Sequence, residues 1–192
     1  MAVPSPHPIK AKLRKEARAA RMRFVSRLED ETRHALEENL AELLAPVLAS
    51  ARIIGTYSPI GSELSPARAI VRARRLGKTI AYPAFEEGDE MFRFRAGEPS
   101  MPGPHRIMQP TTDAPVVTPD LILVPLVACG NGGTRLGQGK GHYDRVLAAQ
   151  KEAGARLIGL GWKVQRLDTD IPAEDWDVPL HAFACPRYLE EF

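Results

Sequence analysis

The sequence predicts an α/β fold with three layers: a mostly parallel, open sheet covered by helices on both faces, and a helical extension at the N-terminus. Short apolar, β-branched segments alternate along the chain with segments of helical spacing, which is the order of right-handed βαβ units. Residues 120–125 are mostly apolar without alternation, as in a strand that is buried on both faces. A chain of 192 residues suits one domain with a substantial core. We therefore expect a single domain over residues 1–192, with residues 1–8 as a loose, proline-rich tail.

A strongly basic segment follows the tail. Residues 9–24 are mainly helix formers and carry many cations against one acid, Glu16. From charge alone, this helix is either a solvated face or a weak nucleic-acid patch. Alternatively, Lys10 and Arg14, which are four residues apart and therefore on one face, reach over a phosphate site elsewhere in the fold. The sequence leaves these alternatives open.

The remaining elements are placed by apolar periodicity and by the residues typical of helix ends. Ser26 with Glu29 forms a capping-box pattern, which predicts the start of a second helix. Ser65 and Pro66 are typical of the start of a third helix, which we expect to end at Gly77. The predicted strands and the one long ordered loop are, in order, 52–57, 78–83, a half-exposed edge strand 91–95, the loop 96–119, 120–125, a central strand 156–162 and a short final strand 182–185.

Composition narrows the classes of function. A formal net charge of +2 is too small for a general nucleic-acid binder, so the clustered cations favour local anion sites. Cys129 and Cys185 match no metal or redox spacing, and we expect both to be reduced. No apolar run is long enough to cross a bilayer, and the first residues lack the apolar core of a secretory signal. We expect a cytoplasmic monomer or weak homodimer with neither a membrane nor a nucleic-acid partner.

Chemistry is most concentrated in a glycine-rich stretch, residues 130–141, between the strand 120–125 and a helix predicted over 143–153. Glycines let backbone N–H groups approach an anion, and the start of a helix adds further N–H donors and the positive end of its dipole. Phosphate is the expected ligand. The stretch is not a Walker loop, because Gly141 follows Lys140 where Ser or Thr is required. It is not a dinucleotide loop either, because His142 occupies the third glycine position.

Three side chains of this region supply what a triphosphate requires. Arg135 offers bidentate contact and Lys140 a point charge, and both are candidate catalytic residues. Asp144, in the first turn of the predicted helix, could hold Mg²⁺ that bridges phosphate oxygens. The alternative for Asp144 is a helix-start acid that the helix dipole favours.

The same region carries a specific resemblance. Arg135-Leu-Gly-Gln-Gly-Lys-Gly-His-Tyr-Asp144 resembles the Arg-Leu-Gly-x-Gly-x-Gly-Tyr-Tyr-Asp signature of the 5-formyltetrahydrofolate cyclo-ligase family, also called methenyltetrahydrofolate synthetases. Agreement continues in order along nearly the whole chain, at Lys10, Leu13-Arg14, Tyr57-Ser58-Pro59, Glu63, Tyr82-Pro83, Gln165, Pro172 and Asp177. The resemblance implies a three-layer α/β fold. It also implies an enzyme that uses ATP and Mg²⁺ to close 5-formyltetrahydrofolate to 5,10-methenyltetrahydrofolate, with release of ADP and phosphate.

The implied reaction makes chemical sense with these residue types. A formamide oxygen is a poor leaving group, so ATP would phosphorylate it, the neighbouring N10 amine would attack the carbon, and phosphate would depart. Such a reaction needs positioning and charge neutralisation more than it needs a covalent nucleophile.

The resemblance also implies which residues bind. ATP would be bound by the N-terminal helix and the glycine-rich stretch, through Lys10, Lys12, Leu13, Arg14, Arg135, Leu136, Gly137, Gln138, Gly139, Lys140, Gly141, His142 and Tyr143. Asp144 would support the metal. The folate would meet Ser58, Glu63, Tyr143 and Trp162, with Glu63 bonding the pterin N–H groups. For Trp162, a place in the core is an equal alternative.

The chain departs from the family pattern at three places. His142 stands where tyrosine is usual, Gln109 where the resemblance predicts glutamate, and Cys129-Gly130 where Phe-Asp is usual. None of these changes removes an anion-binding residue, so they bear on fine substrate contacts. Two other functions remain open: a paralogue that keeps the ATP loop but acts on another substrate, and a nucleic-acid-binding module that uses the basic N-terminal helix.

Overall fold

A seven-stranded sheet forms the centre of the molecule. The structure is a computed structural model, which describes residues 8–86, 88, 91–104, 107–139 and 141–192. The strands are β1 (Ile53–Gly55), β2 (Thr79–Ala84), β3 (Arg93–Ala96), β6 (Leu121–Pro125), β9 (Arg156–Leu160), β10 (Ala182–Cys185) and β11 (Tyr188–Glu191). Their order is β11-β10-β9-β6-β1-β2-β3, with parallel pairing from β10 to β2 and antiparallel pairing at both edges. The predicted mostly parallel, open sheet is confirmed.

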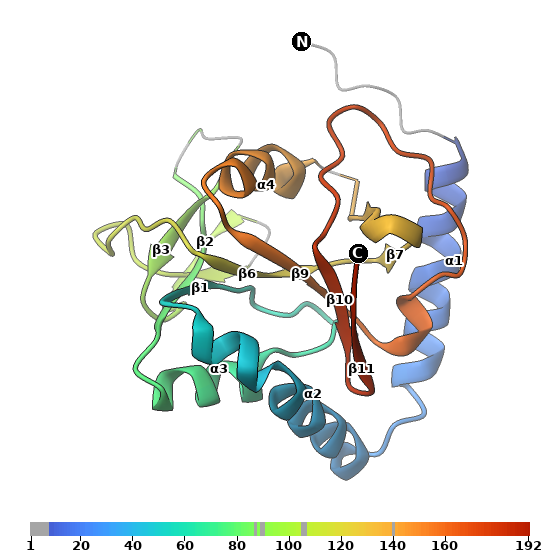
Figure 1. Cartoon of the computed structure of the whole chain (residues 1–192), viewed down its shortest axis with the longest axis horizontal. Coiled ribbons are helices and arrows are strands. Elements are labelled where there is room, and N and C mark those ends of the chain that lie inside the picture. Colours follow the sequence, from blue (N-terminus) through green and yellow to red (C-terminus); the bar gives the residue numbers. More distant parts are fainter. Residues whose placement is uncertain (1–7, 87, 89–90, 105–106, 140) are drawn as a thin grey trace.

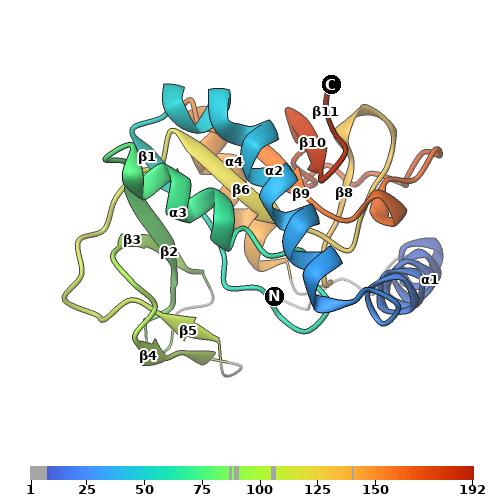
Figure 2. The same cartoon turned by 90° about the horizontal axis from the view of Figure 1, so that it is seen from below.

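Helices cover both faces of this sheet, as Figures 1 and 2 show. Helices α2 (Asp30–Ser50) and α3 (Ala67–Arg75) lie on one face, and α4 (His142–Glu152) lies on the other. Consecutive residues of β6 divide between the two cores: Leu123 packs in the cluster with Leu44 of α2, and Val124 packs in the cluster with Leu147 of α4. This alternation follows from the two-residue period of a strand. The three-layer prediction is therefore confirmed.

Helix α1 (Pro8–Val25) stands at one end of the sheet, shown in blue in Figure 1. Its Ala17 is buried in a small apolar cluster with Val127 and Leu136, and Leu13 packs against the same cluster. Leu136 belongs to a short hairpin of β7 (Ala128–Cys129) and β8 (Arg135–Leu136). The basic N-terminal helix is therefore docked on the segment that carries the glycines. Within the described residues, no helix is long and apolar enough to cross a membrane.

Glycines end two of the predicted helices. Gly77 follows α3 with a φ of +71°, and Gly154 follows α4 with a φ of +90°. Side chains with a Cβ rarely adopt this left-handed region, so glycine is the natural residue after a helix end. Cys129 and Cys185 are both buried and unpaired, as expected.

The predicted start of the second helix is wrong. Helix α2 begins at Asp30, and Glu29 occupies the N-cap position without a side-chain capping bond. The Ser26 hydroxyl instead donates to the carbonyl of Arg23 at 3.2 Å. Ser26 thus belongs to the end of α1, and the turn between the helices removes it from the capping-box geometry.

Three further expectations need correction. The loop predicted over 96–119 contains a short hairpin, β4 (Met101–Pro102) with β5 (Met108–Gln109). The chain does not end its sheet at β10, because β11 returns antiparallel to it. Strand β11 is partly exposed and ends in two glutamates, so its sequence lacks the apolar signal of a core strand. Of the expected tail 1–8, only Pro8 lies within the described residues, and it begins α1, where proline is tolerated.

The sheet order contains a switch point between β1 and β6. From β1 the chain proceeds to β2 on one side, whereas from β6 it proceeds to β9 and β10 on the other side. Loops that leave the carboxyl ends of β1 and β6 therefore separate and open a crevice between them. In open α/β sheets, ligands bind at such a position.

Candidate active site

A cavity of about 410 Å³ lies at this switch point. Its lining comes from the segments that follow β1, β2 and β6, from the β4–β5 hairpin and from the first turn of α4. Most of the wall is apolar or aromatic, and a few polar side chains interrupt it: Arg18, Ser58, Glu63, Gln109, Arg135, Gln138, His142 and Asp144. An apolar cavity with a few placed polar groups is the usual form of a small-molecule site.

Aromatic rings build one wall of the cavity. The Phe92 ring contacts the Tyr143 ring at a centroid distance of 4.9 Å and the Phe85 ring at 5.7 Å. His142 packs edge-on against Phe85 at 5.4 Å. Burial raises the pKa of the Tyr143 hydroxyl, so this side chain stays neutral. The wall offers flat apolar surface to a planar ligand.

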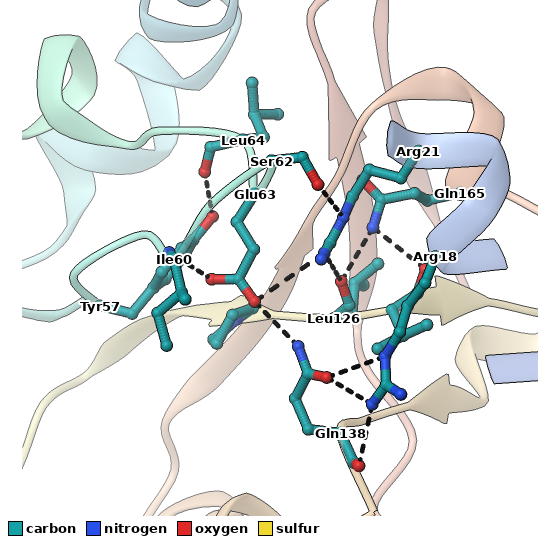
Figure 3. A network of polar contacts seen from close by, with 12 residues as sticks. Arg18, Arg21, Tyr57, Ile60, Ser62, Glu63, Leu64, Leu126, Gln138 and Gln165 are labelled. Carbon is teal, nitrogen blue, oxygen red and sulfur yellow. Dashed lines mark hydrogen bonds and ion pairs between the residues drawn. The ribbon is translucent and has the colours of Figure 1, made fainter. Parts of the chain in front are cut away.

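Glu63 is the buried carboxylate of the cavity, with 6% of its surface exposed. Its Oε2 accepts a hydrogen bond from the Ile60 backbone N–H at 3.0 Å, and its Oε1 accepts one from Gln138 Nε2 at 3.1 Å. Arg21 Nη1 lies 3.8 Å from the same Oε1. Figure 3 shows these groups converging on the carboxylate from three different segments. The side chain is thus held in one orientation beside the cavity.

Arg135 and Asp144 also line the cavity, together with Gly137, Gln138 and Gly139 of the glycine-rich stretch. Arg135 is 6% exposed, forms an ion pair with Asp144, and lies over the Tyr143 ring at 5.6 Å. Its Nε is buried and has no hydrogen-bond partner within the described residues. A Cβ on Gly137 would come within 2.7 Å of Arg135 Nη1, so glycine there makes room for the guanidinium.

The glycine-rich stretch presents open backbone next to this pair. Gly139 has a φ of +92°, and Gly141, at the N-cap of α4, has a φ of +69°. Both conformations favour glycine and leave backbone N–H groups uncovered by side chains. Lys140, predicted between them as a phosphate ligand, lies outside the described residues. The start of α4 behind this stretch adds the positive end of a helix dipole.

A second hollow, of about 660 Å³, runs between α1 and the glycine-rich stretch. Four cations of α1 line it: Arg14, Lys15, Arg18 and Arg21. Arg14 Nε donates to the Gly137 carbonyl at 3.0 Å, and burial together with neighbouring Arg18 lowers the pKa of Arg14. This basic groove and the apolar cavity share Arg18, Gln138 and Gly139 as lining residues. The two spaces therefore adjoin each other at Gln138.

The structure distributes the predicted residues of the N-terminal helix unequally. Arg14 faces the groove, but Lys12 lies on the outer surface, with 77% of its side chain exposed, 3.9 Å from Glu16. Leu13 packs in the apolar cluster under α1. Lys10 is buried, and its ammonium bonds Glu174 at 2.6 Å and Asp177 at 2.5 Å.

The predicted folate residues also separate. Ser58 lines the cavity, and its hydroxyl donates to the Met108 carbonyl at 3.4 Å. Trp162 instead lies in the core, 1% exposed, and does not line the cavity. Its Nε1 donates to the Ser62 carbonyl at 3.0 Å, and its ring contacts Phe24 at 5.5 Å. Of the two alternatives for Trp162, the core position is the one found.

Gln109, one of the departures from the family pattern, has a structural role in this chain. Its amide donates to the Phe85 carbonyl and accepts from the Phe85 N–H, both at 3.1 Å. An ionised glutamate could accept but not donate, so only the amide satisfies both backbone groups. Cys129, another departure, is buried, and burial raises the pKa of its thiol to about 12. Gln109 therefore adjusts the cavity lining, whereas Cys129 lies outside that lining and adds no reactive group.

Sequence reasoning missed part of the network behind Glu63. Arg21 Nε donates to the Ser62 hydroxyl at 3.0 Å, and Gln165 Nε2 donates to the carbonyls of Leu126 and Val127 at 2.8 and 3.1 Å. Arg18 contacts Gln138. The signal for Arg18 and Arg21 was present, because they lie four and seven residues after Arg14 and so share its helix face. The contribution of Phe85 and Phe92 carried no comparable signal.

Metal-binding capacity is limited in the protein alone. Among the residues that the structure describes, no group of three or more His, Cys, Asp or Glu side chains is placed to hold a metal ion. A divalent cation at Asp144 would need further oxygen ligands from a bound molecule. Taken together, fold and site define an α/β enzyme with an apolar ligand cavity beside an anion-binding loop.

Comparison with known sequences agrees with this class and narrows it. The 5-formyltetrahydrofolate cyclo-ligase family matches residues 6–186. The 5-formyltetrahydrofolate cyclo-ligase of Escherichia coli (strain K12) is 28% identical over 155 residues, which cover 77% of this chain and 85% of that protein. The protein of the same name from Mycolicibacterium smegmatis is 29% identical over 174 residues, covering 80% and 85%.

Solved structures show the same relationship. The 5,10-methenyltetrahydrofolate synthetase of Aquifex aeolicus superposes with a TM-score of 0.77 at 25% identity, covering 95% of this chain and 92% of that one. For the synthetase of Mycoplasma pneumoniae, whose likeness concerns the fold, the values are 0.73 and 24%, with coverage of 93% and 99%. The chain belongs to the 5-formyltetrahydrofolate cyclo-ligase family. It is accordingly an ATP-dependent ligase that forms 5,10-methenyltetrahydrofolate from 5-formyltetrahydrofolate.

Proposed function

We propose that the apolar cavity holds 5-formyltetrahydrofolate, that the adjoining glycine-rich stretch holds the phosphates of ATP, and that Mg²⁺ assists at Asp144. The observation that carries this proposal is the position of Arg135. It lines the cavity, lies at the edge of the glycine-rich stretch, and has a buried Nε without a partner in the described residues. Buried polar groups are normally satisfied, so an arginine that lines a cavity and is only partly satisfied by protein groups is a candidate for binding an anionic ligand.

Glu63 is the proposed recognition group for the folate. A pterin ring carries adjacent N–H donors, and a carboxylate accepts such a pair side by side. Each oxygen of Glu63 already accepts one hydrogen bond from the protein, which leaves each with a further lone pair. Ser58 adds a hydroxyl to the cavity lining, and Tyr143 supplies ring surface.

The phosphate contacts are proposed to come from Arg135, Arg14, Lys140 and the backbone from Leu136 to Tyr143. Two observations fit this assignment: the left-handed glycines at 139 and 141, and the start of α4 immediately behind them. Lys10 bonds two carboxylates and keeps at most one ammonium N–H for a phosphate oxygen. Lys12 and Trp162 are left out of the proposed site because of where they lie.

Asp144 is the proposed protein ligand of Mg²⁺. Magnesium prefers a few carboxylate oxygens together with phosphate oxygens and water, which suits a site with one carboxylate beside a phosphate loop. Bound Mg²⁺ would supply charge neutralisation on the phosphates. In the structure, Asp144 forms an ion pair with Arg135. In the proposed site, one carboxylate would therefore contact both Arg135, which binds the phosphates, and Mg²⁺.

The chain's own contribution to the reaction is positioning. The aromatic wall excludes water from the formyl group, Glu63 fixes the ring, and Arg135 stabilises the negative charge that develops as a phosphoryl group moves to the formyl oxygen. Attack by the N10 amine on the formyl carbon then closes the ring, and the oxygen departs with phosphate. The balance is one ATP consumed and one ADP and one phosphate released.

The test is a single absorbance assay. Purified protein with 5-formyltetrahydrofolate, ATP and Mg²⁺ should produce the near-ultraviolet absorbance of the methenyl product, and omission of ATP should abolish it. Removal of Mg²⁺ with EDTA, followed by its re-addition, tests the metal separately. Absence of product under complete conditions would overturn the proposal. ATP binding without folate binding would instead select a paralogue with another substrate.

The nucleic-acid alternative is disfavoured by the placement of the cations. Arg14, Arg18 and Arg21 turn toward the interior groove and bond protein groups, so they do not form an outward basic stripe. A cytoplasmic location and a monomer or weak homodimer stay predictions.

A further inference from the structure

Gln138 links the two binding spaces through its side-chain amide. Arg18 donates to Gln138 Oε1 from Nε at 3.1 Å and from Nη2 at 2.6 Å, and Nη2 also donates to the Gln138 carbonyl at 3.1 Å. On its other side, Gln138 Nε2 donates to Glu63 Oε1 at 3.1 Å. Figure 3 shows the resulting chain from α1 through the glycine-rich stretch to the cavity carboxylate.

The chemistry of this bridge requires a neutral amide. Arginine can only donate hydrogen bonds and an ionised glutamate can only accept them, so the bridging group must accept on one side and donate on the other. These partners also fix which end of the Gln138 amide faces which neighbour. A carboxylate at position 138 would repel Glu63, and a cation would repel Arg18.

The bridge sits at the junction of the two proposed ligand sites. Gln138 and Arg18 line both the apolar cavity and the basic groove, whereas Glu63 lines the cavity alone. Gln138 also stands between Gly137 and Gly139 in the proposed phosphate loop. The signature quoted above does not specify this position, so the bridge does not follow from the family resemblance alone.

We propose that Gln138 is a positioning residue that couples the binding of nucleotide to the binding of folate. This inference rests on the proposed function, because it needs both sites. Contacts that fix the glycine-rich stretch around phosphates also fix Gln138, which then holds Glu63 in the orientation that meets the pterin. By linkage, folate binding strengthens nucleotide binding by the same factor.

The experiment measures this factor directly. The dissociation constant of 5-formyltetrahydrofolate is determined by calorimetry with and without saturating Mg²⁺ and a non-hydrolysable ATP analogue. The unmodified protein should bind folate roughly fivefold or more tightly with the analogue present, the lower end of typical couplings. In Gln138→Ala, the ratio of the two constants should fall to between about one and two.

Two further variants break the bridge on one side at a time. Gln138→Glu keeps a partner for Arg18 but repels Glu63, and Arg18→Ala removes the other end of the bridge while leaving the amide beside Glu63. Both should lose the coupling. Arg23→Ala is the matched control, since it removes the same charge from an exposed position on the same helix, and it should retain the coupling.

The outcomes separate the inference from the proposed function. If the unmodified protein binds neither ligand, the proposed function fails. If it binds both without coupling, or if Gln138→Ala and Gln138→Glu keep the unmodified ratio, the inference fails while the function stands. A merely structural role would lower the melting temperature and weaken both ligands without changing the ratio, and that result also overturns the inference.

Discussion

Two buried cations, Lys10 and Arg135, differ in how completely other protein groups pair with them. Lys10, 3% exposed, bonds both Glu174 and Asp177, and Asp177 also accepts the Glu174 backbone N–H at 2.8 Å. We call these three residues the α1 clamp; their charged groups pair with one another. Arg135, 6% exposed, has a single carboxylate partner, Asp144, and keeps a buried Nε without a partner within the described residues.

This difference in pairing distinguishes a cation that stabilises the fold from one that is available to a ligand. A buried charge costs stability unless it is paired and hydrogen-bonded, and the α1 clamp meets that condition with protein groups. The Arg135–Asp144 pair meets that condition only partly, because Arg135 Nε has no partner within the described residues, and Arg135 lines the cavity. The family resemblance treats Lys10 and Arg135 alike, but the structure predicts that loss of Lys10 acts mainly on stability and loss of Arg135 mainly on catalysis.

The largest effect is expected from Lys10→Met. This change leaves two carboxylates, whose side chains are 29% and 13% exposed, without their cation. Loss of one partner of a fully buried pair costs about 3 to 5 kcal/mol of unfolding free energy, so we expect the low end of that range, about 3 kcal/mol. Urea denaturation of the unmodified and variant proteins measures the difference. The triple variant that adds Glu174→Gln and Asp177→Asn removes the unpaired charges and should recover part of the loss.

Lys163→Met serves as the control, because Lys163 is exposed and the same side-chain change should cost little there. A loss below about 1 kcal/mol in Lys10→Met would show that the clamp is not structural and would end the comparison.

Arg135→Ala should give the second largest effect, and on catalysis. Loss of a charge-assisted contact worth about 1.5 to 3 kcal/mol lowers kcat/KM for ATP roughly 10- to 150-fold. Arg135→Ala also breaks the ion pair with Asp144, but Asp144 lies in the first turn of α4, where the helix dipole stabilises a carboxylate. The melting temperature should therefore change less than in Lys10→Met. Steady-state kinetics in the absorbance assay give the first quantity, and thermal unfolding gives the second.

Arg52→Ala is the matched control, since 90% of that side chain is exposed and it lies outside both hollows. Lys140→Ala should resemble Arg135→Ala if the sequence-based assignment of Lys140 is correct. Unchanged kinetics in both Arg135→Ala and Lys140→Ala would show that the phosphates do not bind at the glycine-rich stretch.

The pH dependence of stability tests what holds the clamp. Burial acts to lower the pKa of Lys10, but hydrogen bonds to Asp177 and Glu174 outweigh it and raise that pKa above its ordinary value of 10.5. A raised folded-state pKa gives stability that is complete below pH 10.5 and disappears as the pH rises through the raised value. The stability gap between the unmodified protein and Lys10→Met should therefore stay constant from neutral pH and close only in the alkaline range. A gap that already narrows below pH 9 would mean that burial prevails.

Most of the fold could be predicted from the sequence because its signals are local. The apolar residues 121–125 predict a buried strand, and the glycines after α3 and α4 predict the ends of those helices. Strand β11 could not be found this way, because its pairing with β10 stabilises a segment whose own residues are partly polar. The prediction from Ser26 was wrong because a capping-box pattern does not show whether the serine begins the second helix or ends the first one.

The site was predictable where one segment carries it and obscure where several meet. The glycine-rich stretch and Arg135 lie in one motif, and Glu63 was reached through the resemblance. The bridge from Arg18 to Glu63 spans three segments, so no spacing in the sequence reveals it. Trp162 shows the converse, because its residue type suits a ligand wall but packing against Phe24 places it in the core.

The smallest effect is expected from Lys12→Ala, which separates position on α1 from charge. Lys12 lies two residues from Lys10, but its side chain is 77% exposed and its nearest carboxylate, Glu16, is 3.9 Å away in an i,i+4 pair. Exposed pairs of this kind contribute about 0.3 to 0.5 kcal/mol, so the unfolding free energy should change by no more than that. The KM for ATP should stay within about twofold of the unmodified value, since surface substitutions rarely reach a distant site. A large rise in that KM would show that Lys12 reaches the nucleotide as the resemblance implies. Because the Lys12 side chain does not line the groove, this result would also require α1 to turn about its axis when ATP binds. Lys10 could then no longer be assigned to stability alone and Arg135 to catalysis alone in the ligand-bound protein.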